Sequence, residues 1–205
     1  MHLHDMSITV QPQVYANSSA FVQDAVAIAE HYGFQGWFID YEDEYPPDTS
    51  ANKTQALAAF LTELGDALHA KNMTLCICVA TWSELLSDFT TLAGSTGIDE
   101  LQLMSTYANP SNSMDMVKSY FADIKRGSGS LKKAGVGMGV YYDGRNGYDK
   151  EWNETTAREF IQDVVVKQGG TSLDMFRLLK DKEHDWPHEA FWWDILDDFV
   201  NGGGK

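Results

Sequence analysis

The chain has 205 residues, of which 43% are hydrophobic, and it carries a formal net charge of −15 at pH 7. This length suits one domain with a sizeable core, and the composition is typical of a globular protein. A strongly acidic chain with no basic stripe is repelled by phosphate backbones, so the sequence argues against a nucleic-acid partner.

Signals for export are mixed. No apolar run approaches the ~20 residues of a membrane helix, so no membrane partner is expected. No signal peptide is visible after Met1, and Cys76 and Cys78 are too close in sequence to predict a disulfide. Acceptor patterns for N-glycosylation begin at Asn17, Asn52, Asn72 and Asn153. They predict a glycoprotein, secreted or in the secretory lumen if a signal peptide lies upstream; coincidence is the alternative, and the compartment otherwise stays unknown.

Short β-rich segments alternate with segments of helical periodicity. The β-rich segments are Ser7–Val10, Gly36–Glu42, Thr74–Thr81, Glu100–Thr106, Val136–Tyr142 and Leu173–Leu178. Between and after them, apolar residues recur at three- and four-residue steps within 21–29, 57–68, 114–124, 160–165 and 191–199. Gly33 can end the first of these helices, and Thr49 or Ser50 can cap the second. This alternation predicts an α/β fold with a parallel sheet.

The second strand distinguishes two parallel architectures. A doubly wound sheet is apolar on both faces, whereas a barrel can carry polar groups on its inner face near the mouth. One face of this strand is bulky and carries Trp37, Ile39 and Tyr41. The other face is mostly small or polar and carries Gly36, Phe38, Asp40 and Glu42. The third strand repeats the alternation. The sequence therefore predicts a (β/α)8 barrel of the TIM type.

Six strands do not close a barrel of eight, and a full domain of this fold typically takes about 250 residues. We therefore expect one barrel domain over 1–205, made of the last six βα units. The N-terminal units would be missing upstream of Met1, or the first strand would pair differently. Open edges of such a sheet would allow self-association.

Asp40 and Glu42 are the strongest candidates for catalysis. Residues two apart on a strand project from the same face, and at the carboxyl end of a barrel strand that face looks into the mouth. Two carboxylates held close together repel when both are ionised, so one of them can keep a proton and donate it to a leaving group. The alternative is that they are only the acidic start of the loop that follows.

The segment Tyr32–Glu42 resembles the fourth-strand motif Asp-Gly-x-Asp-x-Asp-x-Glu of family-18 glycoside hydrolases. It is also similar to the Tyr-Gly-Phe-Asp-Gly-Trp segment of the family-85 endo-N-acetylglucosaminidases. Three later segments resemble the sixth, seventh and eighth strands of that clan, namely Gln102–Met104, Gly137–Tyr142 and Leu173–Phe176. The resemblance implies a hydrolase of β-linked N-acetylglucosamine, in chitin-type chains or N-glycan cores, that needs no cofactor.

The resemblance also implies roles for individual residues. Glu42 would be the general acid and base, and the sugar's own acetamide would attack the anomeric carbon. Asp40 would orient that acetamide and stabilise its developing charge. Substrate-binding positions would be Trp82, Gln102, Met104, Tyr107, Tyr141, Asp174 and Phe176.

The chain departs from the family pattern at several positions. The first two Asp positions of the motif are Gln35 and Phe38 here, and the eighth-strand Trp is replaced by Phe176. The sixth-strand Tyr falls one residue late, at Tyr107, where a bulge would be needed to turn it inward. These departures favour a rival interpretation, a non-catalytic carbohydrate-binding barrel.

Aromatic residues fall into two groups. Four lie near the carboxyl ends of strands, where they could stack on sugar or simply fill the core: Trp82, Tyr107, Tyr141 and Phe176. Three are expected to pack between helices and sheet: Trp37, Trp192 and Trp193. A third possible function is a phosphodiesterase barrel that holds a divalent cation with Asp40, Glu42 and Asp174. No His accompanies these residues, and no metal site is expected.

Overall fold

Strands and helices alternate along the computed structural model, which describes residues 2–3, 14, 17–41, 50–80, 88–105, 110–139, 153–176 and 189–201. The strands are β1 (His2–Leu3), β2 (Gly36–Tyr41), β3 (Thr74–Ala80), β4 (Glu100–Ser105), β5 (Ala134–Gly139) and β6 (Ser172–Phe176). The helices are α2 (Ser18–Tyr32), α3 (Ser50–His69), α4 (Phe89–Gly94), α5 (Pro110–Ser128), α6 (Glu154–Glu159) with the π-helical η4 (Phe160–Val166), and α7 (Glu189–Asn201).

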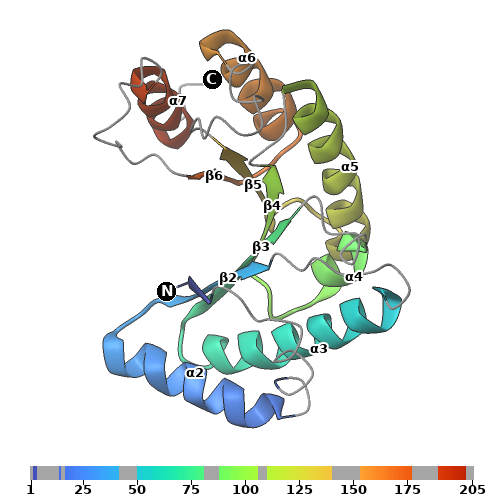
Figure 1. Cartoon of the computed structure of the whole chain (residues 1–205), viewed down its shortest axis with the longest axis vertical. Coiled ribbons are helices and arrows are strands. Elements are labelled where there is room, and N and C mark those ends of the chain that lie inside the picture. Colours follow the sequence, from blue (N-terminus) through green and yellow to red (C-terminus); the bar gives the residue numbers. More distant parts are fainter. Residues whose placement is uncertain are drawn as a thin grey trace, which may run out of the picture.

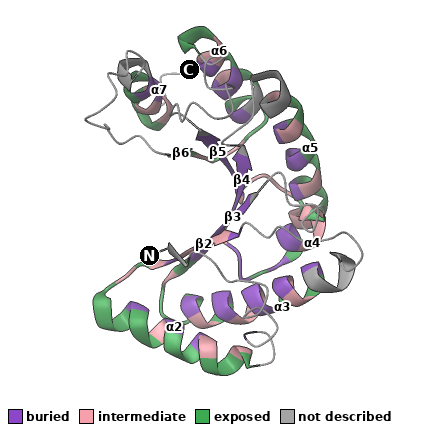
Figure 2. Ribbon diagram, in the orientation of Figure 1, coloured by how far each residue is buried: buried purple, intermediate pink, exposed green. Residues whose placement is uncertain are grey.

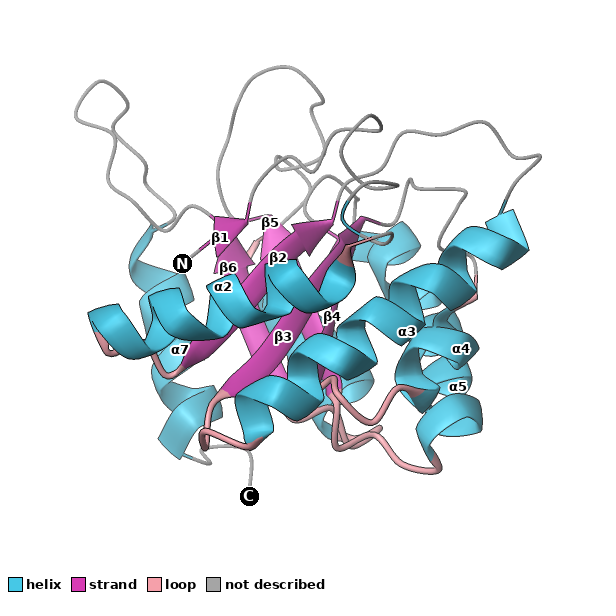
Figure 3. Ribbon diagram, turned by 90° about the horizontal axis from the view of Figure 1, so that it is seen from below, coloured by secondary structure: helices cyan, strands magenta, loops and turns pink. Residues whose placement is uncertain are grey.

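The six strands form one parallel sheet in the order β1-β2-β3-β4-β5-β6. Figure 1 shows the sheet as a curved wall with the helices on its outer side. Figure 3 shows the same sheet from the side, with its strands running up the picture behind α2 and α3. Consecutive parallel strands on a curved wall are the arrangement of a (β/α) barrel. The described strands leave this wall open between β1 and β6, and self-association through these edges stays a prediction.

The main core lies between the sheet and the helices. Ile39, Leu75 and Val79 are 2%, 0% and 0% exposed, so the bulky face of the strands packs outward on the helices, as the alternation predicts. Figure 2 shows the buried residues on the sheet and on the helix faces that meet it. The Trp37 Nε1–H donates to the carbonyl oxygen of Ala25 at 3.1 Å, which ties β2 to α2.

Most predicted elements are confirmed, with two differences near the start of the chain and before β4. Gly33 ends α2 in the left-handed conformation (φ 69°), and its N–H contacts the Ala29 and Glu30 carbonyls. The first strand is His2–Leu3, which pairs with Phe38 and Ile39 on the edge of β2 that does not face β3. The predicted first strand, Ser7–Val10, lies outside the described residues. Helix α4 was not predicted.

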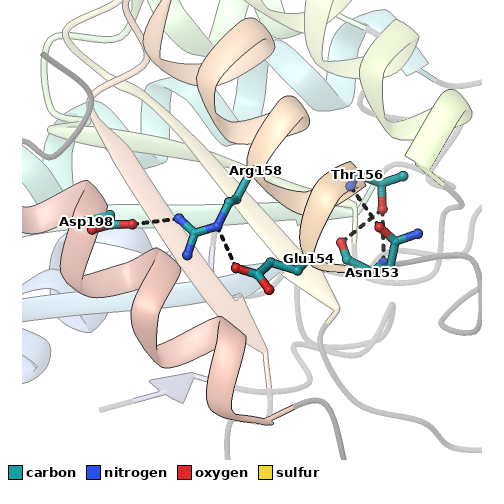
Figure 4. Close-up of polar contacts among 5 residues, drawn as sticks. All are labelled: Asn153, Glu154, Thr156, Arg158 and Asp198. Carbon is teal, nitrogen blue, oxygen red and sulfur yellow. Dashed lines mark hydrogen bonds and ion pairs between the residues drawn. The ribbon is translucent and has the colours of Figure 1, made fainter.

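Helix α7 packs against α6 and corrects one tryptophan prediction. Trp192 is 3% exposed and packs as expected, but Trp193 is 56% exposed. Neighbouring residues on a helix are about 100° apart, so both rings cannot face the same surface. Arg158 of α6 bridges Glu154 on its own helix and Asp198 on α7, at 2.9 and 2.6 Å (Figure 4). All three side chains are at least a third exposed, so this bridge contributes little stability.

The glycosylation and membrane expectations concern the surface. Asn17, Asn72 and Asn153 are exposed, the side chain of Asn52 lies outside the described part, and the modification itself stays a prediction. Among the described helices, none is both long and apolar enough to cross a membrane.

Candidate active site

Parallel pairing places five residues in one row across the inner face of the sheet. Asp40 is in register with Cys78, Cys78 with Gln102, Gln102 with Gly135, and Gly135 with Ser172. Because side chains alternate along a strand, this row points away from the helix-facing residues and into the concave side of the sheet. Small and polar groups therefore line the inner wall, as predicted.

Asp40 has a buried oxygen with no visible donor. Its side chain is half-buried, and Oδ1 has no hydrogen-bond partner among the described residues. A buried carboxylate oxygen left without a donor costs free energy, so a water molecule or a ligand N–H or O–H is expected beside it. Asp40 can thus accept a hydrogen bond from a ligand bound on the concave side of the sheet.

The apolar part of the inner wall is a separate cluster. Cys78 and Met104 are 6% and 8% exposed, and the partly buried Phe38 packs against them. Phe38 therefore places an apolar side chain, in contact with β3 and β4, two residues before Asp40 on the same face of β2.

Sequence reasoning missed Glu100, the first residue of β4. Its Oε1 accepts hydrogen bonds from Ser172 Oγ at 2.6 Å and from Gln102 Nε2 at 3.1 Å. The alternation Glu100, Gln102, Met104 along one strand is the signal that could have revealed it, since all three share the inner face. Gln102 is 3% exposed, and its Oε1 is the other buried side-chain atom without a partner in the described part.

The sequence model of glycosyl hydrolase family 85 matches residues 7–82, which is less than half of the chain but includes Asp40 and Glu42. The sequence similarity of the chain to family 85 is therefore partial. No curated protein matches the sequence.

Several solved structures have a similar fold. The spore cortex-lytic enzyme SleL of Bacillus megaterium aligns over 97% of this chain and 58% of its own, with 12% identity and a TM-score of 0.68. A class V chitinase of Pseudomonas fluorescens aligns over 93% and 76%, with 15% identity and a TM-score of 0.62. A chitinase of Chromobacterium violaceum aligns over 94% and 72%, with 17% identity and a TM-score of 0.56.

These similarities show the fold, an incomplete TIM-type barrel. The chain is shorter than the proteins it resembles. It spans 58% of the SleL chain. The fold alone therefore does not establish the activity of the whole protein.

Only some of the other predicted site residues lie in the part of the chain that the structure describes. Glu42, Trp82, Tyr107 and Tyr141 lie outside the described residues. Phe176 ends β6, but its side chain is also outside them, and Asp174, two residues earlier, is exposed. The structure thus brings Asp40, Gln102 and Met104 to one inner wall, while the roles of all these residues stay predictions.

The cation-dependent alternative finds no support in the part of the chain that the structure describes. No group of three His, Cys, Asp or Glu side chains there is arranged to hold a metal ion. Asp40 and Asp174 belong to different rows of the wall, because Asp174 is in register with Gly137 rather than Gly135. The third proposed ligand, Glu42, lies outside the described residues.

Cys76 is expected to be an unreactive thiol. Burial, followed by the negative charges of Glu100 and Asp99, raises its pKa from 9.0 to about 11. In a Cys78→Ala variant, alkylation at pH 8 should be roughly 100-fold slower than for a thiol of pKa 9.0, because the thiolate is the reactive form. The rate should rise with pH toward 11, as followed by mass spectrometry. The unfolded protein in urea gives the rate of a thiol with an ordinary pKa. An alkylation rate that levels off near pH 9 in the folded protein as well would contradict the raised pKa of Cys76.

Proposed function

We propose that the chain is the larger part of a glycoside hydrolase that cleaves β-linked N-acetylglucosamine, in chitin-type oligosaccharides or N-glycans. Two observations support the reaction class. The family-85 match covers the strand that carries Asp40 and the adjoining Glu42, and the fold is that of enzymes described as chitinases and as a spore cortex-lytic enzyme.

The observation that carries the proposal is the unpartnered oxygen of Asp40. A carboxylate facing the concave side of a barrel, with Oδ1 buried and no donor beside it in the described residues, is suited to accept a hydrogen bond from a ligand. The N–H of a 2-acetamido group is such a donor. It also becomes positively charged when the acetamide reacts, which favours an anionic partner.

The proposed mechanism uses the substrate's own acetamide as nucleophile. Glu42 gives its proton to the glycosidic oxygen, the bond from that oxygen to C1 breaks, and the acetamide carbonyl oxygen forms a bond to C1. Asp40 accepts from the acetamide N–H and balances the positive charge on the resulting ring. Ionised Glu42 then takes a proton from water, whose oxygen attacks C1 and restores the acetamide.

Substitution of Asp40 by Asn tests the charge at this position. Asn keeps the shape but loses the negative charge, so turnover of an aryl chitobioside should fall by roughly 10- to 100-fold, the value of a charge-assisted hydrogen bond. Asp24, exposed on α2, provides the matched control Asp24→Asn, which should leave turnover unchanged. Rates are measured from the released aryl group.

The same assay distinguishes the competing mechanisms. An aryl glucoside has no acetamide and should not be cleaved. Equal cleavage of the glucoside and the chitobioside would exclude the substrate-assisted mechanism. Binding of chito-oligosaccharide with no hydrolysis at all would favour the non-catalytic carbohydrate-binding barrel.

A further inference from the structure

The amide of Gln102 is held in one orientation by Glu100. Its Nε2 donates to Glu100 Oε1 at 3.1 Å, and an ionised carboxylate can only accept. The amide therefore cannot turn over without placing its own oxygen against the carboxylate. Ser172 Oγ, 2.6 Å from the same Oε1, holds the Glu100 carboxylate in place from β6.

The Gln102 oxygen consequently points up the inner wall, toward the carboxyl ends of the strands. The lower part of its side chain crosses Gly135, where an added Cβ would lie 2.9 Å from Gln102 Cγ and 2.6 Å from Glu100 Oε1. Its Oε1 would lie 4.0 Å from a Cβ on Gly137, which is two residues nearer the carboxyl end of β5. The absent side chain at Gly135 is what leaves space for this arrangement.

Two unpartnered acceptors then share one row of the wall. Asp40 Oδ1 and Gln102 Oε1 are the only buried side-chain atoms without a hydrogen-bond partner among the described residues. Both residues are in register with Cys78, one on each side of it. Two buried acceptors in the same row, with an apolar group between them, indicate a ligand with two donors or a separate ordered water at each oxygen.

We propose that Glu100 is a positioning residue that presents Gln102 Oε1 as a second acceptor for the sugar bound at Asp40. This inference rests on the proposed function and deepens it. The donor to Gln102 is a hydroxyl or N–H of the same N-acetylglucosamine unit. Glu100 itself does not touch the sugar; it acts through Gln102, and Ser172 fixes Glu100.

The test exchanges donor and acceptor between residues 100 and 102 and measures chitotriose binding to the whole chain by calorimetry. Every protein compared carries Glu42→Gln, so that the sugar is bound but not cleaved, and the chain unchanged at residues 100 and 102 is the wild-type reference. In Glu100→Gln, residue 100 can donate as well as accept, so the Gln102 amide is free to turn and affinity should fall about 10-fold. Combining Glu100→Gln with Gln102→Glu places a carboxylate at 102 that accepts from residue 100 and keeps an oxygen toward the sugar. Affinity in this double variant should recover toward the wild-type value.

Glu63 supplies the matched control, because its Oε1 also accepts from a serine hydroxyl, Ser19 Oγ at 2.7 Å, but on the outer helices. Glu63→Gln should leave chitotriose binding unchanged. The side-chain amide resonance of Gln102 in a ¹⁵N spectrum gives a readout that needs no sugar, and it should shift in Glu100→Gln alone.

Each outcome bears on a different claim. Recovery in the double variant supports the positioning role, since a merely structural defect would grow with a second substitution. Chitotriose binding that Glu100→Gln leaves unchanged would overturn the role of Glu100 while leaving the proposed function intact. Absence of any chitotriose binding by the wild-type chain, with the Gln102 resonance still dependent on Glu100, would overturn the proposed function.

Discussion

Turnover of an aryl chitobioside is expected to fall by about 10²–10⁴-fold when Glu42 is replaced by glutamine. Glutamine keeps the size and hydrogen-bonding capacity of the side chain but has no carboxylic proton to give to the leaving oxygen. Sugar affinity should change little, because the ground-state contacts are kept. The measurement is kcat from the released aryl group, with the Kd of chitotriose determined on the same preparations.

Glu44→Gln is the matched control for this experiment. It lies two residues further along the same acidic segment, Asp43–Asp48, where the sequence predicts solvated loop charge. Turnover of Glu44→Gln should equal that of the wild type. A loss of activity in Glu44→Gln as large as in Glu42→Gln would mean that the acidic segment acts as a whole and that Glu42 is not the general acid.

Replacing Gly65 with alanine is expected to destabilise the fold by about 3 kcal/mol or more. A Cβ at Gly65 of α3 would lie 2.0 Å from the carbonyl oxygen and 2.3 Å from the Cα of Gly97, in the segment that leads into β4. Both are backbone atoms, so no side-chain rotation relieves the clash. The better helix propensity of alanine, about 1 kcal/mol, does not offset this cost. For a chain of this size the melting temperature should fall by roughly 6–12 °C.

Gly94→Ala provides the comparison for this substitution. Gly94 is also helical, at the end of α4, and the nearest atom to its added Cβ would be the Gly127 carbonyl oxygen at 3.7 Å, an ordinary contact. Its melting temperature should be unchanged or slightly higher. Equal melting temperatures for the Gly65→Ala and Gly94→Ala proteins would contradict the close approach of α3 to the segment at Gly97.

The sequence by itself determined the strand–helix order and the two faces of the wall. Trp37, Ile39 and Tyr41 alternate with Phe38 and Asp40 because a strand exposes opposite faces at successive residues. This two-residue periodicity is visible in the sequence and can be recognised without knowing which strands pair. Gly33 could likewise be read as a helix end, because a left-handed residue there favours glycine.

Short or irregular elements carried too little signal to be predicted. Helix α4 has six residues and buries only Leu92 and Ala93, so no apolar stripe repeats along it. The segment Phe160–Val166 has helical spacing but forms π-helical turns, which apolar spacing does not distinguish from α-helical ones. The residue type of Trp193 predicts packing between helix and sheet. Its exposure depends instead on the direction in which its side chain leaves the axis of α7.

Only the tertiary structure decided which residues meet across strands. Glu100, Gln102 and Ser172 come together because β4, β5 and β6 pair in a fixed register, with Gly135 leaving room between them. Glu100 and Ser172 are 72 positions apart, and no sequence periodicity predicts a contact between such distant residues. The orientation of the Gln102 amide follows from its hydrogen bond to Glu100, whose carboxylate is held by Ser172, since a carboxylate can accept but not donate.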